Sequence, residues 1–296
     1  MKDAFSGYHP LVNFLYFAFI FLFSMVFMHP ICLGVSLISS FIYSIYLRGK
    51  KAAKFNFAFL LPMLLITALV NPAFNHEGAT ILTYFHTGNP LTFESMIYGV
   101  AAATMLASVV CWFSCYNEIM TSDKFVYLFG RIIPAMSLIL SMSLRFVPRL
   151  KHQIKVVSDA QRCIGRDVSN GSILSRARHG ITILSIVITW ALENAIETAD
   201  SMKSRGYGLP GRTAFSIYRF DARDKNAITA ILILGAYVLL GGIAGGLKWR
   251  YFPTIKGRMG EFYTISLYLA YVALCLVPVI VDRKEEQQWK ATQLKI

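Results

Sequence analysis

The stretch Leu11–Leu47, LVNFLYFAFIFLFSMVFMHPICLGVSLISSFIYSIYL, contains no Asp, Glu, Lys or Arg in 37 consecutive positions. A helix needs about 20 largely apolar residues to cross about 30 Å of hydrocarbon. The stretch is long enough for two such helices, and His29-Pro30 divides it into Leu11–Met28 and Ile31–Leu47. The sequence therefore predicts a hairpin of two membrane-spanning helices, and we read the first as retained in the protein because a second apolar run follows at once.

Four further charge-free runs have the same character, and they are Phe57–Phe74, Ser95–Asn117, Asn226–Leu247 and Phe262–Val281. The 296 residues are 55% hydrophobic and only 15% charged, whereas soluble domains are about 45–50% apolar and about 25% charged. The predicted fold class is an all-α integral membrane protein. We expect a bundle of about six transmembrane helices with two long cytoplasmic helices.

The loop charges orient the predicted spans. Residues 48–54 carry four cations and no acid, and residues 148–225 carry 13 Lys or Arg against 7 Asp or Glu. Cytoplasmic loops are enriched in Lys and Arg, so both segments are predicted inside, and residues 71–94, which carry two Glu and no cation, outside. The loop charges thus predict a multi-pass membrane protein with both termini in the cytoplasm. One predicted outer loop disagrees with the charge rule, and its cations are Lys248, Arg250, Lys256 and Arg258.

The long basic segment reads as two helices. Apolar positions from Pro148 onward recur at helical spacing with cations on the other faces, and Gly165 is a predicted stop. A second helix is predicted from about Ser172 to Arg205, with Gly206 as its stop. We therefore divide the chain into residues 1–131 (four spans), 132–225 (interfacial and coupling-helix region) and 226–296 (a transmembrane hairpin and cytoplasmic tail).

The ends of these two helices resemble each other. Asp159-Ala-Gln-Arg-Cys-Ile-Gly165 aligns with Asp200-Ser-Met-Lys-Ser-Arg-Gly206 at its acid, its cation, its small residue and its glycine. A cation in the last turn can simply complement the helix dipole, which contributes about 0.3–1 kcal/mol. An Arg that projects beyond a helix end can instead pair with a carboxylate of a partner protein. Two such ends in the largest predicted cytoplasmic segment favour a docking role.

Arg145 lies among apolar residues shortly before Pro148. A charge in that position is costly unless it is paired or reaches the membrane interface. We predict that Arg145 and Pro148 form a hinge or interface anchor where the bundle meets the coupling helices.

The sequence resembles the transmembrane T component of energy-coupling factor transporters, the family that includes cobalt and nickel transporter membrane subunits. The resemblance rests on Leu144-Arg-Phe-Val-Pro148, on Asp159-Ala-Gln-Arg-x-x-Gly-x-Asp167 and on Met202-Lys-Ser-Arg-Gly-Tyr-Gly208. It implies that two short motifs at the ends of long coupling helices dock into grooves of a pair of ABC-type ATPases.

By this resemblance Ser204, Arg205 and Gly206 match the second docking motif closely. The first motif departs from the family pattern, because Ile164, just before Gly165, stands where the family has an Arg. Arg162 or Arg166 is then a candidate for the missing contact, and apolar docking of the first end is the alternative.

The implied partners are two ATPase subunits, a substrate-binding S component and the lipid membrane, with no nucleic acid. No phosphate-binding loop of the form Gly-x-x-x-x-Gly-Lys-Ser/Thr occurs in the sequence, so ATP and Mg would be bound by the partner ATPases. We expect no cofactor, no metal and no catalytic residue in this chain, which we take as a non-enzyme. The scattered His residues and the pair Cys111 and Cys115 lack the ligand set of a metal site.

The resemblance implies a multi-pass protein of a bacterial cell membrane. Its implied function is transmission of ATP-driven movement to the S component, for uptake of a vitamin or a metal ion. The alternative is a self-sufficient secondary transporter or channel with a basic cytoplasmic regulatory segment. That alternative requires an ionisable group within a span, and the apolar runs contain no Asp, Glu, Lys or Arg.

Overall fold

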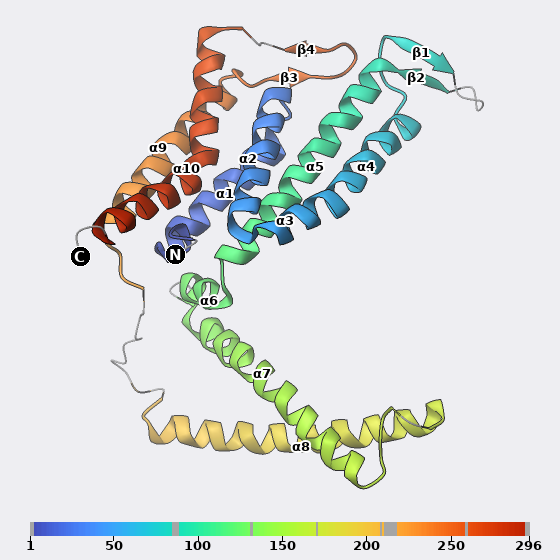
Figure 1. The fold of residues 1–296 in the computed structure, drawn as a ribbon, viewed down its shortest axis with the longest axis vertical. Coiled ribbons are helices and arrows are strands. Elements are labelled where there is room, and N and C mark those ends of the chain that lie inside the picture. The colour runs from blue at the N-terminus through green and yellow to red at the C-terminus, as the bar shows by residue number, and fades with distance from the viewer. Residues whose placement is uncertain are drawn as a thin grey trace. The chain divides into compact units, whose positions relative to one another are not determined.

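A computed structural model describes residues 3–84, 89–130, 133–169, 171–207, 209, 218–257 and 260–293. The chain forms two compact units (Figure 1). The first, which we call the bundle, contains residues 1–121 and 218–296, and the second, the arm, contains residues 122–217. The predicted three-part division stays a prediction, and its boundary at residues 131 and 132 lies outside the described residues.

The described part of the bundle is almost entirely helical (Figure 1). A short 3-10 turn, Phe5–Gly7, precedes the first helix, and a π-helical turn, Asn56–Leu60, joins α3 to α4. The helices are α1 (Pro10–Val26), α2 (Pro30–Arg48), α3 (Lys50–Phe55), α4 (Leu61–Phe74), α5 (Phe93–Ile119), α9 (Ala222–Ile243) and α10 (Phe262–Gln293).

The first two helices begin in the same way because each starts with a His-Pro pair. Pro10 and Pro30 occupy the first helical position, where the missing N–H costs nothing and the fixed φ suits the helix. The Nδ1 atoms of His9 and His29 accept hydrogen bonds from the N–H group two residues further on, at 3.2 and 3.3 Å. The predicted turn at His29-Pro30 is therefore confirmed as a helix start.

Among the residues that the structure describes, six helices are long and apolar enough to cross a membrane by length and composition: α2, residues 50–74, α5, α8, α9 and α10. This set differs from the predicted spans in two places. The sequence predicts a span at Leu11–Met28, where α1 has only 17 residues. It also predicts that residues 172–205, which include α8, belong to the cytoplasmic region rather than to a span. Residues 173–204 (α8) have a mean hydropathy of 1.3, the lowest of the six. The number of about six spans is confirmed.

Aromatic and small polar side chains fill the centre of the bundle. Trp112 is fully buried, and its ring lies 6.2 Å from that of Tyr16 and 6.2 Å from that of Tyr43. Its Nε1–H donates to Ser36 Oγ at 3.1 Å, and Ser36 is hydrogen-bonded to Ser24 at 2.8 Å. Buried helix contacts of this kind suit a membrane protein, because packing and interhelical hydrogen bonds replace the hydrophobic effect there.

Glycines near the end of α9 allow other segments to approach this helix closely. A Cβ atom at Gly241 would overlap the side chain of Leu267 in α10, and one at Gly242 would overlap Phe27. The close approach of α10 to α9 therefore depends on the absence of side chains here.

Two small hairpins lie at one end of the bundle (Figure 1). Strands β1 (Ile81–Tyr84) and β2 (Pro90–Thr92) are antiparallel, as are β3 (Trp249–Arg250) and β4 (Lys256–Gly257). The Ala79 N–H donates to the carbonyl of Pro253 at 3.1 Å and joins the two loops. The cationic loop therefore shares an end of the bundle with the loop predicted outside.

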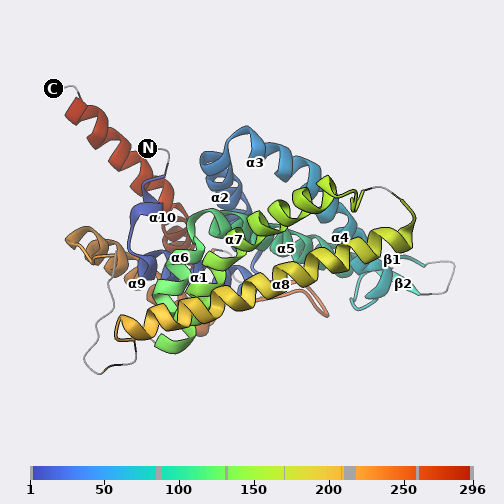
Figure 2. The ribbon, with the colours of Figure 1, turned by 90° about the horizontal axis from the view of Figure 1, so that it is seen from below.

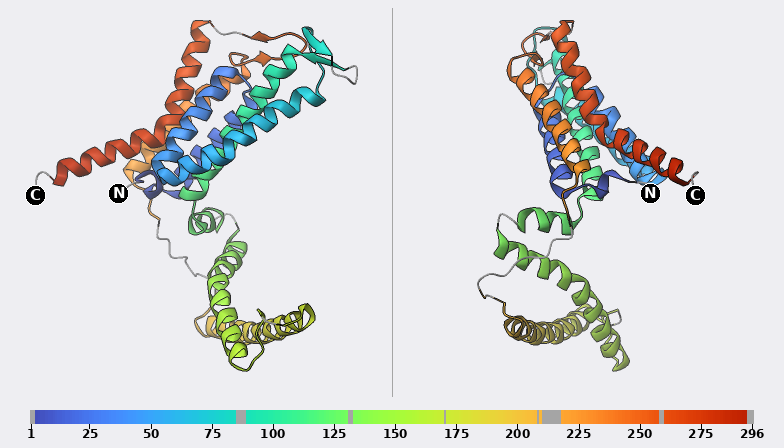
Figure 3. Two further views of the ribbon diagram at one scale, coloured as in Figure 1. Left: turned by 45° about the vertical axis from the view of Figure 1, so that its right-hand side comes forward. Right: turned by 90° about the vertical axis from the view of Figure 1, so that its left-hand side faces the viewer.

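The other end of the bundle holds the cations that follow α2, and we call it the basic end. Arg48 Nε pairs with Glu118 Oε2 at 2.7 Å, so the end of α5 lies there as well. Helix α10 also reaches this end and bends along its length (Figure 3). Pro278 lies inside α10, and a proline removes a helix hydrogen bond and bends the helix.

The arm consists of α6 (Ser122–Gly130), α7 (Pro134–Cys163) and α8 (Ile173–Ser204). Helices α7 and α8 cross (Figures 1 and 2). Val157 of α7 is buried with Ile183 and Val187 of α8. Nearer the start of α7, Phe146 stacks on Trp190 at 6.0 Å. Later residues of α7 thus contact earlier residues of α8, so the two helices run in opposite senses through their contact.

Candidate docking site at the ends of α7 and α8

The two helix ends have the same backbone geometry. At the end of α7, the Gly165 N–H donates to Arg162 O and the Arg166 N–H donates to Gln161 O, each at 3.0 Å. At the end of α8, the Gly206 N–H donates to Lys203 O and the Tyr207 N–H donates to Met202 O, again at 3.0 Å. Both are Schellman motifs, in which a residue with positive φ closes the helix.

Glycine is required at both closures. Gly165 has a φ of 79° and Gly206 a φ of 73°, and residues with a Cβ atom rarely adopt this conformation. Each helix therefore ends where the sequence predicts, because the stop depends on a local conformational preference. Gly208, the last residue of the third passage that carries the resemblance, lies outside the described residues.

The geometry aligns the predicted docking residues pair by pair. Ile164 and Arg205 are the cap residues that follow the last helical residue, with φ and ψ of −93° and 10° and of −83° and 10°. Both side chains are exposed. Cys163 and Ser204 occupy the preceding position, so the predicted alignment of the two ends is reproduced in three dimensions.

The two candidate replacements for the missing Arg differ in their surroundings. Arg162 Nε lies 3.4 Å from Asp167 Oδ2, and the Arg162 side chain is 71% exposed. Hydrogen bonds from Ser169 and, to a smaller extent, the charge of Arg162 lower the pKa of Asp167. Arg166 follows Gly165 and is exposed. Their roles in docking stay predictions.

The predicted anchor residues lie within α7. Helix α7 runs continuously from Pro134 to Cys163 with Pro148 inside it, and Arg145 is exposed. Arg149, next to Pro148, stacks over the ring of Trp190 in α8 at 5.4 Å. This contact fixes the crossing of the two helices, while a hinge at Arg145 and Pro148 stays a prediction.

A group of acidic residues at the basic end of the bundle was missed by the sequence analysis. Asp282 Oδ1 accepts hydrogen bonds from the N–H groups of Ala4 and Phe5, both at 2.8 Å. Asp224 accepts from the N–H groups of His9 and Asp221, both at 3.0 Å. These contacts join the N-terminal segment to the start of α9 and to α10.

Further contacts support this joint between the N-terminal segment, the start of α9 and α10. Arg223 Nη1 pairs with Glu285 Oε1 at 2.9 Å, and the guanidinium lies over the ring of Tyr8 at 4.6 Å. The joint surrounds the start of α9, which is where the chain re-enters the bundle after the arm. The spacing of Asp221 and Asp224 is a capping pattern that indicates a helix start in the sequence. No comparable pattern in the sequence marks Asp282.

Replacement of Asp282 by Ala is expected to lower the free energy of unfolding by about 2–4 kcal/mol, because a buried donor without a partner costs about 1–3 kcal/mol. Asp282→Asn keeps an acceptor oxygen and is expected to lose less. Thermal unfolding of both variants in detergent measures the difference. Equal melting temperatures for Asp282→Ala and Asp282→Asn would show that the two hydrogen bonds do not support the joint.

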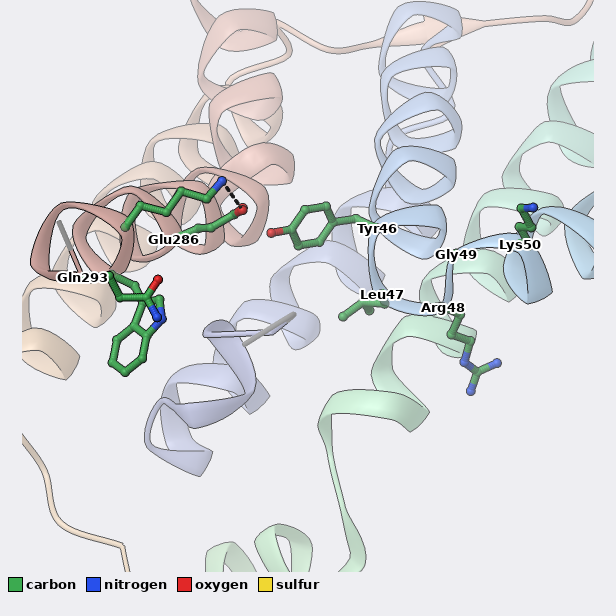
Figure 4. A pocket seen from close by; sticks show the side chains of 9 residues that line it. Tyr46, Leu47, Arg48, Gly49, Lys50, Glu286 and Gln293 are labelled. Carbon is green, nitrogen blue, oxygen red and sulfur yellow. Dashed lines mark ion pairs between the residues drawn. The ribbon is translucent and has the colours of Figure 1, made fainter.

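A pocket of about 640 Å³ also lies at the basic end, between the end of α2 and the last turns of α10 (Figure 4). Tyr46 points across it toward Glu286, whose Oε1 pairs with Lys290 Nζ at 2.8 Å. None of the predicted docking residues is among its described lining residues, which include Trp289 and Lys50. Among all described residues, no group of three or more His, Cys, Asp or Glu is placed to hold a metal ion.

The fold and the two capped helix ends define a class of protein, a multi-pass α-helical membrane protein with a helical arm. The sequence profile described as "CbiQ: Cobalt transport protein" matches residues 8–217, which are 210 of the 296 residues. The chain belongs to this family, and the resemblance found in the sequence is confirmed.

Three relatives support this membership, each named energy-coupling factor transporter transmembrane protein EcfT. The Lactobacillus helveticus protein is 31% identical over 109 residues, 36% of this chain and 39% of the relative. The Streptococcus thermophilus protein is 38% identical over 106 residues, 35% and 40% of the two chains. The Staphylococcus aureus protein is 25% identical over 235 residues, 74% and 85% of the two chains. The chain thus matches about two fifths of the length of the first two relatives.

Proposed function

We propose that this chain is the transmembrane coupling subunit of an energy-coupling factor importer. It transmits ATP-driven movement of two ABC-type ATPase subunits to a substrate-binding S component, which brings a vitamin or metal ion into the cell. The observation that carries the proposal is the pair of identical helix closures on two crossed helices, which place Ile164 and Arg205 at equivalent exposed positions.

The bundle supports this proposal by the way it connects to the arm. The chain leaves the bundle after α5 and re-enters it at α9, and contacts of Glu118 and Asp224 place both points at the basic end. The positive-inside rule assigns such an end to the cytoplasm, where ATP is available. Phe5, near the described start of the chain, contacts Asp282 of α10, and the last turns of α10 line a pocket with the end of α2, so both described segments lie at this end.

Within the proposal the chain itself performs no chemistry. ATP and Mg are bound by the partner ATPases, and the S component selects the substrate. Rigid helices suit the transmission of movement, because the crossing at Val157, Ile183 and Val187 couples a displacement of one helix end to the other helix.

Purification of the tagged full-length chain from detergent-solubilised native membranes tests the function. ABC-type ATPases are expected to co-purify in a two-to-one ratio with the chain, together with a small membrane protein and with ATP hydrolysis. A parallel purification of an unrelated tagged membrane protein is the control. Absence of an ATPase, combined with ion-driven uptake by the chain alone in liposomes, would instead establish the secondary transporter.

A further inference from the structure

The pocket at the basic end has two walls that come from different parts of the bundle (Figure 4). One wall is the turn from α2 to α3, residues 46–50, in which Gly49 has a φ of 59°. The other wall is one face of the last turns of α10, and its residues recur at the spacing i, i+3, i+4 and i+7: Glu286, Trp289, Lys290 and Gln293. The pocket thus lies between the end of one candidate span and the end of another.

The pocket exists because α2 and α10 separate toward the basic end. At the opposite end of the bundle the two helices are in contact, since Tyr268 Oη and His29 Nε2 lie 2.9 Å apart. Pro278 lies between Tyr268 and the turns of α10 that line the pocket, and a proline bends a helix. The volume of about 640 Å³ lies within the range of about 300–1,000 Å³ of ligand pockets, so a small polar group can enter.

The lining of the pocket carries more cations than acids. Arg48, Lys50 and Lys290 line it, and Glu286 is the one acid among its described lining residues. Arg48 pairs with Glu118 of α5, and Glu286 pairs with Lys290. Within the described part of the chain Lys50 has no ion-pair partner. An anion in the pocket therefore meets a net positive charge.

Further exposed cations surround both walls. Lys51 and Lys54 follow the first wall in the sequence, and Arg283 and Lys284 precede the second. Clusters of Lys and Arg directly beside a transmembrane helix attract anionic lipids of the membrane surface. The charge around the pocket thus has the sign that favours a phosphate group.

Two aromatic side chains with polar tips also line the pocket. Tyr46 points across it (Figure 4), and Trp289 is 58% exposed. The Tyr hydroxyl and the Trp N–H group are hydrogen-bond donors, and both residue types are enriched at membrane–water interfaces. The pocket therefore has the residues of a site at the depth of the lipid headgroups.

An apolar track on α2 begins at the pocket. Ile42 lies one turn before Tyr46 and Ile38 two turns before it, and these side chains are 46% and 61% exposed. Residues at the spacing i, i+4 lie on one face of a helix, so the track continues the wall that contains Tyr46. A soluble phosphate ion would leave the track uncovered, whereas the acyl chain of a lipid covers it.

We propose that this pocket binds the phosphate headgroup of an anionic phospholipid, with one acyl chain along Ile42 and Ile38. Lys50 and Lys290 neutralise the phosphate, and Trp289 closes the side of α10. Basic pockets between transmembrane helices on the cytoplasmic side are sites of this kind. The bound lipid joins the end of α2 to the last turns of α10, whichever partners the arm has, so the proposal does not depend on the proposed function.

Titration of the purified full-length chain with phosphatidylglycerol in neutral detergent tests the site, with bound lipid measured by native mass spectrometry. Phosphatidylcholine, glycerol phosphate and inorganic phosphate are added as competitors. We expect each competitor to bind at least about tenfold more weakly than phosphatidylglycerol, because each lacks either the net charge or the acyl chain. Equal competition by either soluble phosphate would overturn the lipid assignment, and equal competition by phosphatidylcholine would overturn the role of the charge.

A matched pair of double variants tests the position of the site. Lys50→Gln with Lys290→Gln removes two cations from the lining and is expected to weaken the Kd for phosphatidylglycerol at least about tenfold. Lys54→Gln with Lys284→Gln removes the same charge from the same two helices at exposed positions outside the lining. This control is expected to change the Kd less than about threefold. An equal Kd for the two double variants would show attraction by net charge alone and overturn the proposal.

Discussion

The variant Arg205→Glu is expected to bind the ATPase pair at least about 30-fold more weakly than the natural chain. Loss of one partner of a buried, hydrogen-bonded charge pair costs about 2–5 kcal/mol at protein interfaces. Charge reversal would add repulsion from a partner carboxylate, the group with which Arg205 is proposed to pair. The Kd of the purified chain for the ATPases in detergent measures this effect, and ATP-driven uptake in liposomes is expected to fall with it.

Two controls separate docking from a simple helix-end effect. Arg178→Glu reverses an exposed charge near the start of the same helix and is expected to leave the Kd nearly unchanged. Arg205→Lys keeps the charge but loses the planar fork that binds a carboxylate through two hydrogen bonds, so an intermediate Kd is expected. If Arg205→Glu binds ATPases as tightly as Arg178→Glu, Arg205 only completes the helix end and the docking assignment fails.

The variant Trp112→Ala is expected to lower the free energy of unfolding of the bundle by about 3–5 kcal/mol, the range for loss of a buried Trp or Phe side chain. Trp112 is fully buried between α1 and α2, and its N–H is bonded to Ser36. Thermal unfolding in detergent, followed by the loss of monodisperse protein, measures the change.

The neighbouring residue provides a matched control for this prediction. Phe113 is 51% exposed, so its removal leaves little buried space, and Phe113→Ala is expected to cost less than about 1 kcal/mol. Trp112→Phe keeps most of the aromatic volume and loses the hydrogen bond, which is expected to cost about 1–2 kcal/mol. A melting temperature of Trp112→Ala equal to that of Phe113→Ala would contradict the assignment of the core.

Sequence alone determined the features of this protein that depend on local chemistry. The assignment to membrane proteins follows from the charge-free runs, because an unpaired charge in hydrocarbon is unfavourable whatever the fold. The helix starts at Pro10 and Pro30 and the helix ends at Gly165 and Gly206 depend on φ values that single residues impose. The equivalence of Ile164 and Arg205 was visible for the same reason, because a glycine at a helix stop fixes the position of the residue before it.

Only the tertiary structure decided which distant residues meet. Asp282 contacts Phe5 across 277 positions of the chain, and no local pattern marks a carboxylate that accepts hydrogen bonds from a remote segment. The apolar half of α8 has the composition of a membrane span, yet Ile183 and Val187 pack on Val157 of α7. Composition measures how much apolar surface a helix offers, and the partner that covers this surface is selected by packing against other helices. The directions of the ends of α7 and α8 relative to each other also follow from that crossing.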